Sequence, residues 1–118
     1  MNKYRNKWTQ CKLGHNHQSK REAEYCNELY LLKKANKIKD YTSQRRFELW
    51  CKDQYVCSHI VDFFVRRIEY IIGVGDEGYC YIDEVHEVKS KPTQNALWQL
   101  KKRLFEINYP DIKYIVIE

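Results

Sequence analysis

The stretch YVCSHIVDFFVRRIEYII, residues 55–72, decides the fold because it is the most strongly β-prone run in the chain. It is rich in valine, isoleucine, phenylalanine and tyrosine, the residue types that favour strands. Around Asp62 the expected strand is apolar on both faces, which carry Ile60 and Phe64 on one side and Val61, Phe63 and Val65 on the other. Such a strand is usually central in its sheet and covered on both sides.

Asp62 lies on one of these two apolar faces. Burying its carboxylate there costs several kcal/mol unless a cation or hydrogen bonds compensate. The segment YCYIDEVHEVK, residues 79–89, is predicted to return beside it after the turn GVGDEG. In such a hairpin Asp62 and Glu87 share a face with Lys89, and two adjacent carboxylates require a shared proton or a divalent cation. A solvated Glu87–Lys89 ion pair, with Asp62 capping a loop, explains the spacing equally well.

The remaining segments complete the order α-β-β-β-α-β. A first helix is predicted from the capping-box pair Ser19 and Glu22 to about Asn36. Residues 45–51 are predicted to form the first strand, and residues 112–118 the last. Residues 94–107 form a second helix with Thr93 as its N-cap and with an apolar stripe made of Leu97, Leu100, Leu104 and Ile107.

Length and composition predict one domain over residues 1–118, of the α+β class, with a mixed central sheet flanked by helices. Apolar residues make up 43% of the chain, and no apolar run approaches the ~18 residues that span a membrane. The opening MNKYRNKWTQ lacks the apolar core of a signal peptide. A cytoplasmic protein without a membrane partner is therefore expected.

The net charge of +5 is unevenly distributed. Residues 1–18 form a basic arm, and a second basic cluster consists of Lys89, Lys91, Lys101, Lys102 and Arg103. Such patches favour a polyanionic partner, most simply nucleic acid, although ordinary solvated lysines explain the charge as well.

Five cysteines, without an export signal, indicate reduced thiols or a metal site. A candidate structural zinc site in the arm and first helix follows the pattern C-x3-H-x-H-x8-C, formed by Cys11, His15, His17 and Cys26. Two alternatives remain open: Cys26 is a small core residue, and the GHNH segment is a basic loop that contacts phosphate. The other cysteines, Cys51, Cys57 and Cys80, are expected to pack inside the sheet.

The motifs VDF at residues 61–63 and EVK at residues 87–89, after a helix bearing Glu22, resemble the PD-(D/E)XK nuclease superfamily. Its restriction-endonuclease-like αβββαβ core has the same element order. Residues 13–118 further resemble a family of small phage-encoded proteins that are similar to Holliday-junction resolvases. The sequence departs from the expected pattern at three positions, where Val61 replaces the proline, His86 an acidic residue and Ser90 a glycine.

The resemblance implies roles for the site residues. Asp62 and Glu87 would bind Mg²⁺ or Mn²⁺, with the backbone carbonyl of Val88 as a further ligand, and Lys89 would orient or help deprotonate the attacking water. Glu22 would complete the acidic cluster, although its place in the capping box is a competing explanation. Gln44 is a candidate for positioning water or phosphate. The candidate DNA-contacting residues are Lys12, Lys20, Lys91, Lys101, Lys102 and Trp8.

The function implied by the resemblance is metal-dependent hydrolysis of phosphodiester bonds in DNA, selective for branched structures, by an endonuclease of a phage or prophage in its bacterial host cell. A homodimer is an open alternative to a monomer. The first competing function is a non-catalytic, zinc-stabilised nucleic-acid-binding module. The second is an interaction protein of phage replication or recombination.

Overall fold

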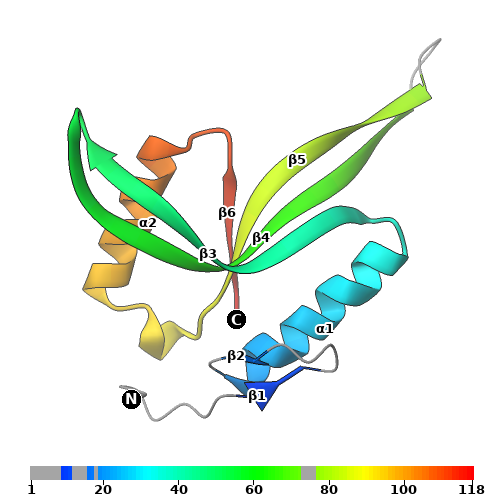
Figure 1. Ribbon diagram of the computed structural model, residues 1–118, viewed down its shortest axis with the longest axis horizontal. Coiled ribbons are helices and arrows are strands. Elements are labelled where there is room, and N and C mark those ends of the chain that lie inside the picture. Colours follow the sequence, from blue (N-terminus) through cyan, green and yellow to red (C-terminus); the bar gives the residue numbers. More distant parts are fainter. Residues whose placement is uncertain (1–8, 12–15, 18, 73–76) are drawn as a thin grey trace.

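The computed structural model describes residues 9–11, 16–17, 19–72 and 77–118. It confirms the expected α+β class, since a mixed four-stranded sheet is flanked by two helices (Figure 1). The helices are α1 (Lys20–Lys34) and α2 (Ala96–Asn108), with a 3-10 turn η1 (Lys91–Thr93) before α2. The strands are β1 (Thr9–Gln10), β2 (Asn16–His17), β3 (Ile38–Cys51), β4 (Gln54–Ile72), β5 (Glu77–Val88) and β6 (Lys113–Ile117).

The main sheet has the strand order β3-β4-β5-β6. Strand β4 pairs antiparallel with β3 and with β5, so it lies inside the sheet, as residues 55–72 predicted. Strands β5 and β6 run parallel, because α2 forms the crossover between them. Within the predicted arm, β1 and β2 form a separate two-stranded antiparallel ribbon.

Helix α1 forms as the sequence predicted. The Ser19 hydroxyl accepts a hydrogen bond from the backbone N–H of Glu22 at 3.1 Å, which caps the first turn. Ala23, Cys26 and Leu29 recur at helical spacing and are buried against the sheet. The chain then turns through Asn36, whose φ of 57° lies in the left-handed region.

Strand β3 begins at Ile38, seven residues before the predicted start at residue 45. The segment DYTSQ, residues 40–44, is too polar to indicate a strand by its pattern. Pairing with β4 holds it in place, since Tyr41 lies opposite Val65 and Thr42 opposite Phe64. Tertiary pairing has therefore overridden local preference here.

Helix α2 differs from the prediction in its cap and in its buried face. Asn95, not Thr93, is the N-cap, and its side chain accepts from the N–H of Trp98 at 2.9 Å. The predicted apolar stripe is exposed at Leu97, Leu100 and Ile107. Trp98 and Phe105 are buried instead. Seven-residue spacing places both aromatic side chains on one face, and their larger apolar area gains more from burial.

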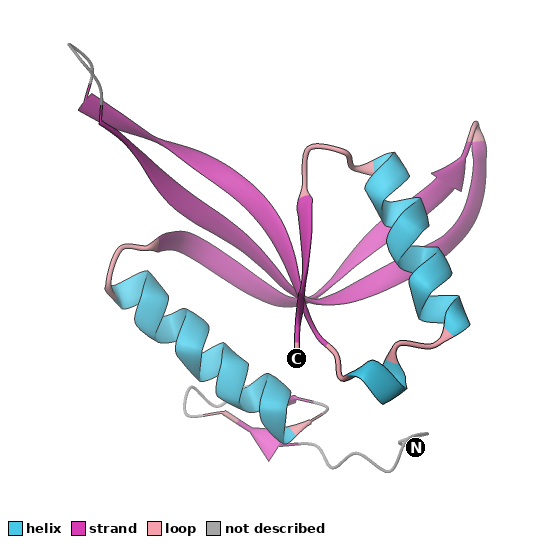
Figure 2. Cartoon of the chain, turned by 180° about the vertical axis from the view of Figure 1, so that it is seen from behind, coloured by secondary structure: helices cyan, strands magenta, loops and turns pink. Residues whose placement is uncertain are grey.

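The core consists of two clusters, one under each of the two helices that Figures 1 and 2 show beside the sheet. The first lies under α1 and includes Phe63 and Val65 of β4. The second lies under α2 and includes Val61 and Phe64 of the same strand. Strand β4 therefore joins the two clusters, and Asp62 lies between them.

Two packing predictions are wrong. Ile60 is exposed although its face of β4 was expected to be covered, because it lies at the rim of a pocket rather than under a helix. Cys51 and Cys80 are exposed, so the packing expected of them is wrong, whereas Cys57 is half-buried and packs against the cluster that contains Phe105. Cys51 is the last residue of β3, beside the turn into β4, and Cys80 lies near the start of β5 in the projecting β4–β5 hairpin.

The β4–β5 hairpin projects away from the rest of the molecule (Figure 2). The whole molecule, with this hairpin, measures 54 × 41 × 22 Å along its principal axes. Among the described residues, no helix is long and apolar enough to cross a membrane.

Candidate active site

Asp62 and Glu87 lie side by side where β4 and β5 separate. The ladder between these strands ends at the pair Phe63 and His86. Beyond it, the Asp62 N–H donates to Glu87 Oε1 at 2.8 Å, and the Val88 N–H donates to Asp62 Oδ2 at 2.8 Å. The two carboxylates thus replace the next backbone bonds of the ladder, and each keeps one oxygen free of these two contacts.

Glu22 reaches the same place from the first turn of α1. Its side chain is buried and shares a hydrogen bond with the Asp62 carboxyl. Its Oε1 also accepts from Gln44 Nε2 at 2.8 Å. The Glu22 carboxyl therefore faces the acids of the sheet, while Ser19 alone supplies the side-chain cap described above.

Gln44 holds an uncommon backbone conformation in the middle of β3. Its φ of 54° lies in the left-handed region, which a non-glycine residue adopts at a cost of about 1–3 kcal/mol. Its neighbours Ser43 and Arg45 pair in unbroken register with Phe63 and Val61 of β4. The strained residue therefore lies opposite Asp62 and directs its amide to Glu22.

The pKa values of all three acids are raised, and the charge of Asp62 contributes to the rise at both glutamates. Burial and then the charge of Asp62 raise the pKa of Glu22 to about 8, and the same two causes raise the pKa of Glu87 to about 8. Burial also raises the pKa of Asp62, although the Val88 N–H, the charge of Lys89 and the hydrogen bond with Glu22 oppose this. In the cation-free chain the two glutamates therefore hold protons near neutral pH, because the charge of Lys89 alone does not offset three clustered carboxylates.

A pocket of about 360 Å³ opens beside these acids. We call it the acid pocket, and it is lined by Gln44, Ser58, His59, Ile60, Asp62, Glu87, Lys89, Asn95, Leu97, Trp98 and Lys101. Glu22 lies behind this lining and contacts it through Gln44 and Asp62. The pocket has room for a phosphate group and several waters.

Lys89 and Trp98 form the cationic side of the acid pocket. Lys89 Nζ lies 5.8 Å from the centre of the Trp98 ring, within the range of a cation–π contact. The charge of Lys89 lowers the pKa of all three acids. The indole N–H of Trp98 is buried without a hydrogen-bond partner among the described residues, although it lies near enough to Glu87 to lower its pKa.

His59 and Tyr114 belong to this site and were missed by sequence reasoning. His59 is buried in the pocket wall, and its Nε2 lies 2.8 Å from the Tyr114 hydroxyl. Burial, followed by the charges of Lys101 and Lys89, lowers the pKa of His59 to about 4, so the ring is neutral. The two residues are 55 positions apart, and no local pattern links them.

His86, which departs from the expected family pattern, belongs to a different network. Its Nδ1 lies 2.6 Å from the Tyr25 hydroxyl and its Nε2 lies 2.9 Å from Glu84. Glu84 in turn pairs with Arg67 at 3.2 Å. His86 therefore ties α1 to β5 and does not enter the acid pocket.

The chemistry of the acids suits a small divalent cation. Within the described ranges, no group of three or more His, Cys, Asp or Glu side chains is arranged to hold a metal ion. Mg²⁺, however, is usually held by one or two carboxylates, with water and substrate phosphate oxygens as the other ligands. Asp62 and Glu87 meet that requirement, and both are hard oxygen donors. Val88 contributes its N–H to Asp62, and its carbonyl remains a predicted ligand.

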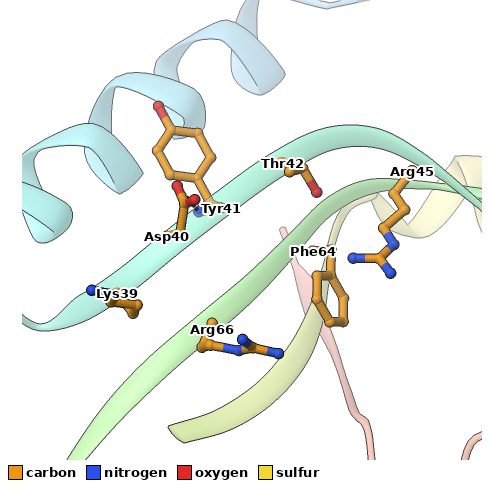
Figure 3. A pocket seen from close by; sticks show the side chains of 7 residues that line it. All are labelled: Lys39, Asp40, Tyr41, Thr42, Arg45, Phe64 and Arg66. Atoms are coloured by element: carbon orange, nitrogen blue, oxygen red, sulfur yellow. Dashed lines mark hydrogen bonds between the residues drawn. The ribbon is translucent and has the colours of Figure 1, made fainter.

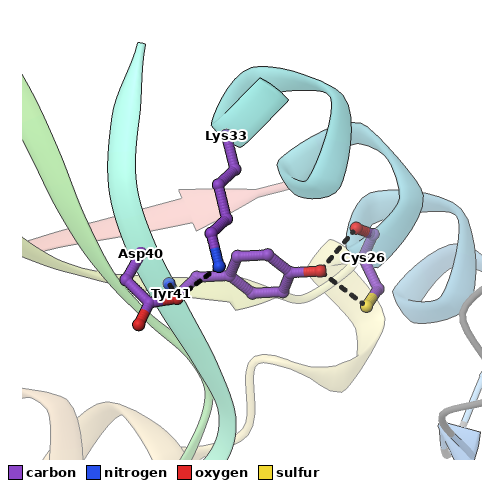
Figure 4. A network of polar contacts seen from close by, with 4 residues as sticks. All are labelled: Cys26, Lys33, Asp40 and Tyr41. Atoms are coloured by element: carbon purple, nitrogen blue, oxygen red, sulfur yellow. Dashed lines mark hydrogen bonds and ion pairs between the residues drawn. The ribbon is translucent and has the colours of Figure 1, made fainter. Parts of the chain in front are cut away.

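Two of the four predicted zinc ligands lie together. Cys11 and Cys26 are both buried in the cluster under α1, and their sulfurs share a hydrogen bond. The Tyr41 hydroxyl contacts Cys26 Sγ at 3.7 Å and donates to the Cys26 carbonyl at 3.5 Å (Figure 4). His15 and the His17 side chain lie outside the described residues, so the zinc site stays a prediction.

The predicted DNA-contacting residues are only partly gathered at the site. Lys101 lines the acid pocket with Lys89, and Lys91 is exposed in η1 just beyond it. Lys102 pairs with Glu106 at 3.2 Å, and Lys20 is exposed at the start of α1. Lys12 and Trp8 lie outside the described residues.

A second pocket, of about 260 Å³, lies between β3 and β4 and has different chemistry (Figure 3). Its Arg45 guanidinium stacks on Phe64 at 4.3 Å from the ring centre. Arg66 pairs with Asp83 at 2.9 Å, and Asp40 with Lys33 at 3.1 Å (Figure 4). Among its lining residues only Asp40 is acidic, so this pocket does not duplicate the acid cluster.

A family model described as "Protein of unknown function (DUF1064)" matches residues 1–118 of the chain. No curated protein and no solved structure matches it. What the chain does is therefore inferred from the acid pocket itself.

Proposed function

The chain belongs to the DUF1064 family, and we propose from its acid pocket that it hydrolyses phosphodiester bonds in DNA with the help of a divalent cation. One observation carries the proposal. Carboxyls from α1, β4 and β5, on Glu22, Asp62 and Glu87, meet beside the amine of Lys89 at a pocket that is open to solvent. Buried acids with raised pKa values beside a cation are typical of active sites.

Asp62 and Glu87 would hold Mg²⁺ or Mn²⁺ through the carboxylate oxygens that do not accept from the backbone N–H groups of Val88 and Asp62. When bound, the cation supplies Lewis-acid activation of water and of the phosphate. Glu22 supports the pair through its bond to Asp62, and Gln44 fixes the direction of Glu22.

Lys89 has two roles in the proposed reaction. Its ammonium stabilises negative charge on the phosphate as water attacks phosphorus in line, and it orients that water. The bond from phosphorus to the 3′ oxygen breaks, so the products are a 3′ hydroxyl and a 5′ phosphate, and one water is consumed. Trp98 holds the Lys89 amine at the pocket wall through its ring.

DNA is the proposed substrate because the chain carries a net charge of +5 and because Lys101 lines the pocket together with Lys89, while exposed Lys91 follows in η1. Contacts to phosphates carry no sequence information. A domain of this size has little further surface for reading bases, which favours a structure-selective endonuclease over a sequence-specific one. Branched DNA in a phage-infected bacterial cell is the proposed setting.

Cleavage assays with matched variants test the proposal. Wild type, Asp62→Asn and Lys89→Ala are incubated with linear duplex, single-stranded and four-way-junction DNA, with Mn²⁺ or with EDTA. We expect wild type to cleave only with the cation, and Asp62→Asn and Lys89→Ala each to lose about 100-fold or more in rate. The controls are Asp53→Asn and Lys37→Ala, which change the same residue types at exposed positions.

The other outcomes contradict the proposal in different ways. Cleavage by Asp62→Asn at the wild-type rate would remove the acid pocket from the reaction. DNA binding without cleavage would favour the non-catalytic binding module, and neither binding nor cleavage would favour the interaction protein. The contact between Cys11 and Cys26 makes zinc content worth measuring in the same samples. Bound zinc that Cys11→Ser abolishes is the result expected of a structural zinc site.

A further inference from the structure

Helix α2 presents an apolar stripe to solvent. Leu97, Leu100 and Ile107 are 62%, 63% and 75% exposed, and Leu104 between them is half-buried. The helix is anchored through a different face, which buries Trp98 and Phe105. We call Leu97, Leu100, Leu104 and Ile107 the α2 stripe. Single exposed apolar residues are ordinary, but a contiguous row on one helix is typical of an interaction surface.

The spacing of the α2 stripe matches a helix–helix seam. Its members are three, four and three residues apart, which is the alternation of the a and d positions of a heptad. The row extends over ten residue steps, about 15 Å along the helix. A partner helix can therefore lie along α2 with its own apolar residues between these side chains.

The charges beside the α2 stripe select the partner. In the heptad register, Lys101 takes an e position and Arg103 a g position, one on each side of the stripe. Neither forms an ion pair with the rest of the described chain, whereas Lys102 pairs with Glu106 on the helix itself. We propose that the α2 stripe docks an amphipathic helix of another protein whose apolar seam is flanked by acidic residues.

A second copy of this chain is a poorer fit to the same surface. If two α2 helices pair in parallel, Lys101 of one meets Arg103 of the other. If they pair antiparallel, lysine meets lysine and arginine meets arginine. Like charges oppose each other in both arrangements, whereas glutamates at the partner's flanking positions would pair in either.

The α2 stripe lies beside the acid pocket, so a helix docked on it would affect access to that pocket. Leu97 and Lys101 belong both to this surface and to the lining of the acid pocket. A helix held along the stripe would therefore lie at the pocket mouth. The docking itself does not depend on whether the pocket cleaves DNA, so it can be tested alone.

Two synthetic peptides test the partner's chemistry. Each is a short stapled helix with leucine at a and d, shown to be monomeric by sedimentation, and the two differ only in glutamate or lysine at e and g. Fluorescence anisotropy with the full chain should give an affinity of about micromolar for the glutamate peptide. The lysine peptide should bind at least about tenfold more weakly than the glutamate peptide. This difference in affinity should shrink in high salt.

Surface variants locate the contact. Leu100→Glu and Ile107→Glu should each lower the affinity for the glutamate peptide by about tenfold or more. Arg103→Glu should reduce the preference of the chain for the glutamate peptide over the lysine peptide. The matched control is Leu31→Glu, because Leu31 on α1 is 64% exposed and lies outside the stripe. All four sites are exposed, and thermal unfolding checks that the variants stay folded.

Four results would overturn the inference. These are no binding of the glutamate peptide, equal binding of the two peptides, and equal losses from Leu31→Glu and Leu100→Glu. The fourth is a concentration-dependent dimer of the wild type that Leu100→Glu abolishes, which would assign the stripe to a second copy. If the glutamate peptide does not bind and Leu100→Glu also lowers the affinity for DNA, the surface would be assigned to nucleic acid.

Discussion

At the scale of single residues, Glu22 links α1 to the sheet through a carboxyl that is buried beside Asp62 and Gln44. A buried acid next to another acid is stable when it holds a proton and is destabilised when it ionises. The same arrangement prepares the cluster to accept a cation in place of protons. Ionisation of Glu22 therefore destabilises the cation-free protein, and the same raised pKa is expected of a carboxyl in the proposed cation site.

Glu22→Gln should flatten the pH dependence of stability in EDTA. The pKa of Glu22 is raised from 4.5 to about 8 on folding. The stability linked to its protonated form is thus present at low pH and is lost as pH rises through about 8. In urea unfolding, the free energy of unfolding of wild type should fall by about 1–2 kcal/mol more than that of Glu22→Gln between about pH 6.5 and about pH 8.5.

Two features make this measurement specific. The chosen window lies above the range in which His59 contributes, because the pKa of that ring is lowered to about 4 on folding. Glu24→Gln is the control, since Glu24 is exposed on the same helix, and it should follow the wild-type profile. Parallel profiles for wild type and Glu22→Gln would show that Glu22 is ionised throughout.

Trp98 is the other residue whose role can be isolated. Trp98→Phe keeps an aromatic face for Lys89 and removes an N–H that has no partner within the described chain, whereas Trp98→Leu removes both. If the ring positions the amine, the leucine variant should lose about tenfold in kcat and the phenylalanine variant less than about threefold. Steady-state kinetics on the cleaved DNA measure this. Equal losses would contradict a role for the ring.

At the scale of elements, the end of α2 that faces the acid pocket depends on one cap. Asn95 caps this helix and also lines the pocket. Its side chain accepts from the Trp98 N–H, so the cap fixes the position of Trp98 in the first turn of α2. Asn95→Ala should lower the free energy of unfolding by about 1 kcal/mol.

Thr93→Ala is the informative comparison for that cap. Thr93 was the N-cap predicted from the sequence, but its hydroxyl donates to the Ser90 carbonyl within the exposed turn η1. Its substitution should change the free energy of unfolding by less than about 0.5 kcal/mol. Chemical denaturation of both variants decides between the two caps, and a larger loss from Thr93→Ala would contradict the structure.

At the scale of the whole molecule, two small cores share one strand. The radius of gyration of 16.1 Å exceeds the about 13.5 Å expected of a compact chain of this length, because the hairpins extend beyond the cores. Since β4 supplies side chains to both clusters, neither cluster can lose its packing without disturbing the strand that holds Asp62. Stability and the geometry of the acid pocket are therefore coupled through β4.

Core truncations test this coupling. Leu29→Ala under α1 and Phe105→Ala under α2 remove fully buried side chains, and each should cost about 3 kcal/mol or more. In both variants, tryptophan fluorescence and far-UV circular dichroism should report one coincident transition. Leu31→Ala is the exposed control and should change stability by less than about 0.5 kcal/mol. Separate transitions in either variant would show that the clusters unfold independently.

Much of this arrangement was predictable because its signals are local. The cap at Ser19 and the spacing of Ala23, Cys26 and Leu29 predicted α1. The two-residue period placed Glu87, in β5, on the same side of the chain as Lys89, which directly follows that strand. Gly-rich residues between two β-prone runs predicted the hairpin. The prediction of Asp62 beside Glu87 required only that these runs pair in the register that the structure has.

Other features depend on contacts that no sequence pattern contains. The leucine row of α2 has the same spacing whether it is buried or exposed, and only the docking of the aromatic face onto the second cluster left it in solvent. Likewise, His59 meets Tyr114 and Trp98 meets Lys89 only because the crossover places α2 against the sheet and adds β6 at its edge. The amino-acid sequence by itself thus determined the elements and the paired acids, since propensity, capping and strand period act over a few residues. The tertiary structure alone decided which helix face is free and which distant side chains complete the pocket, because those outcomes depend on competition for burial across the whole chain.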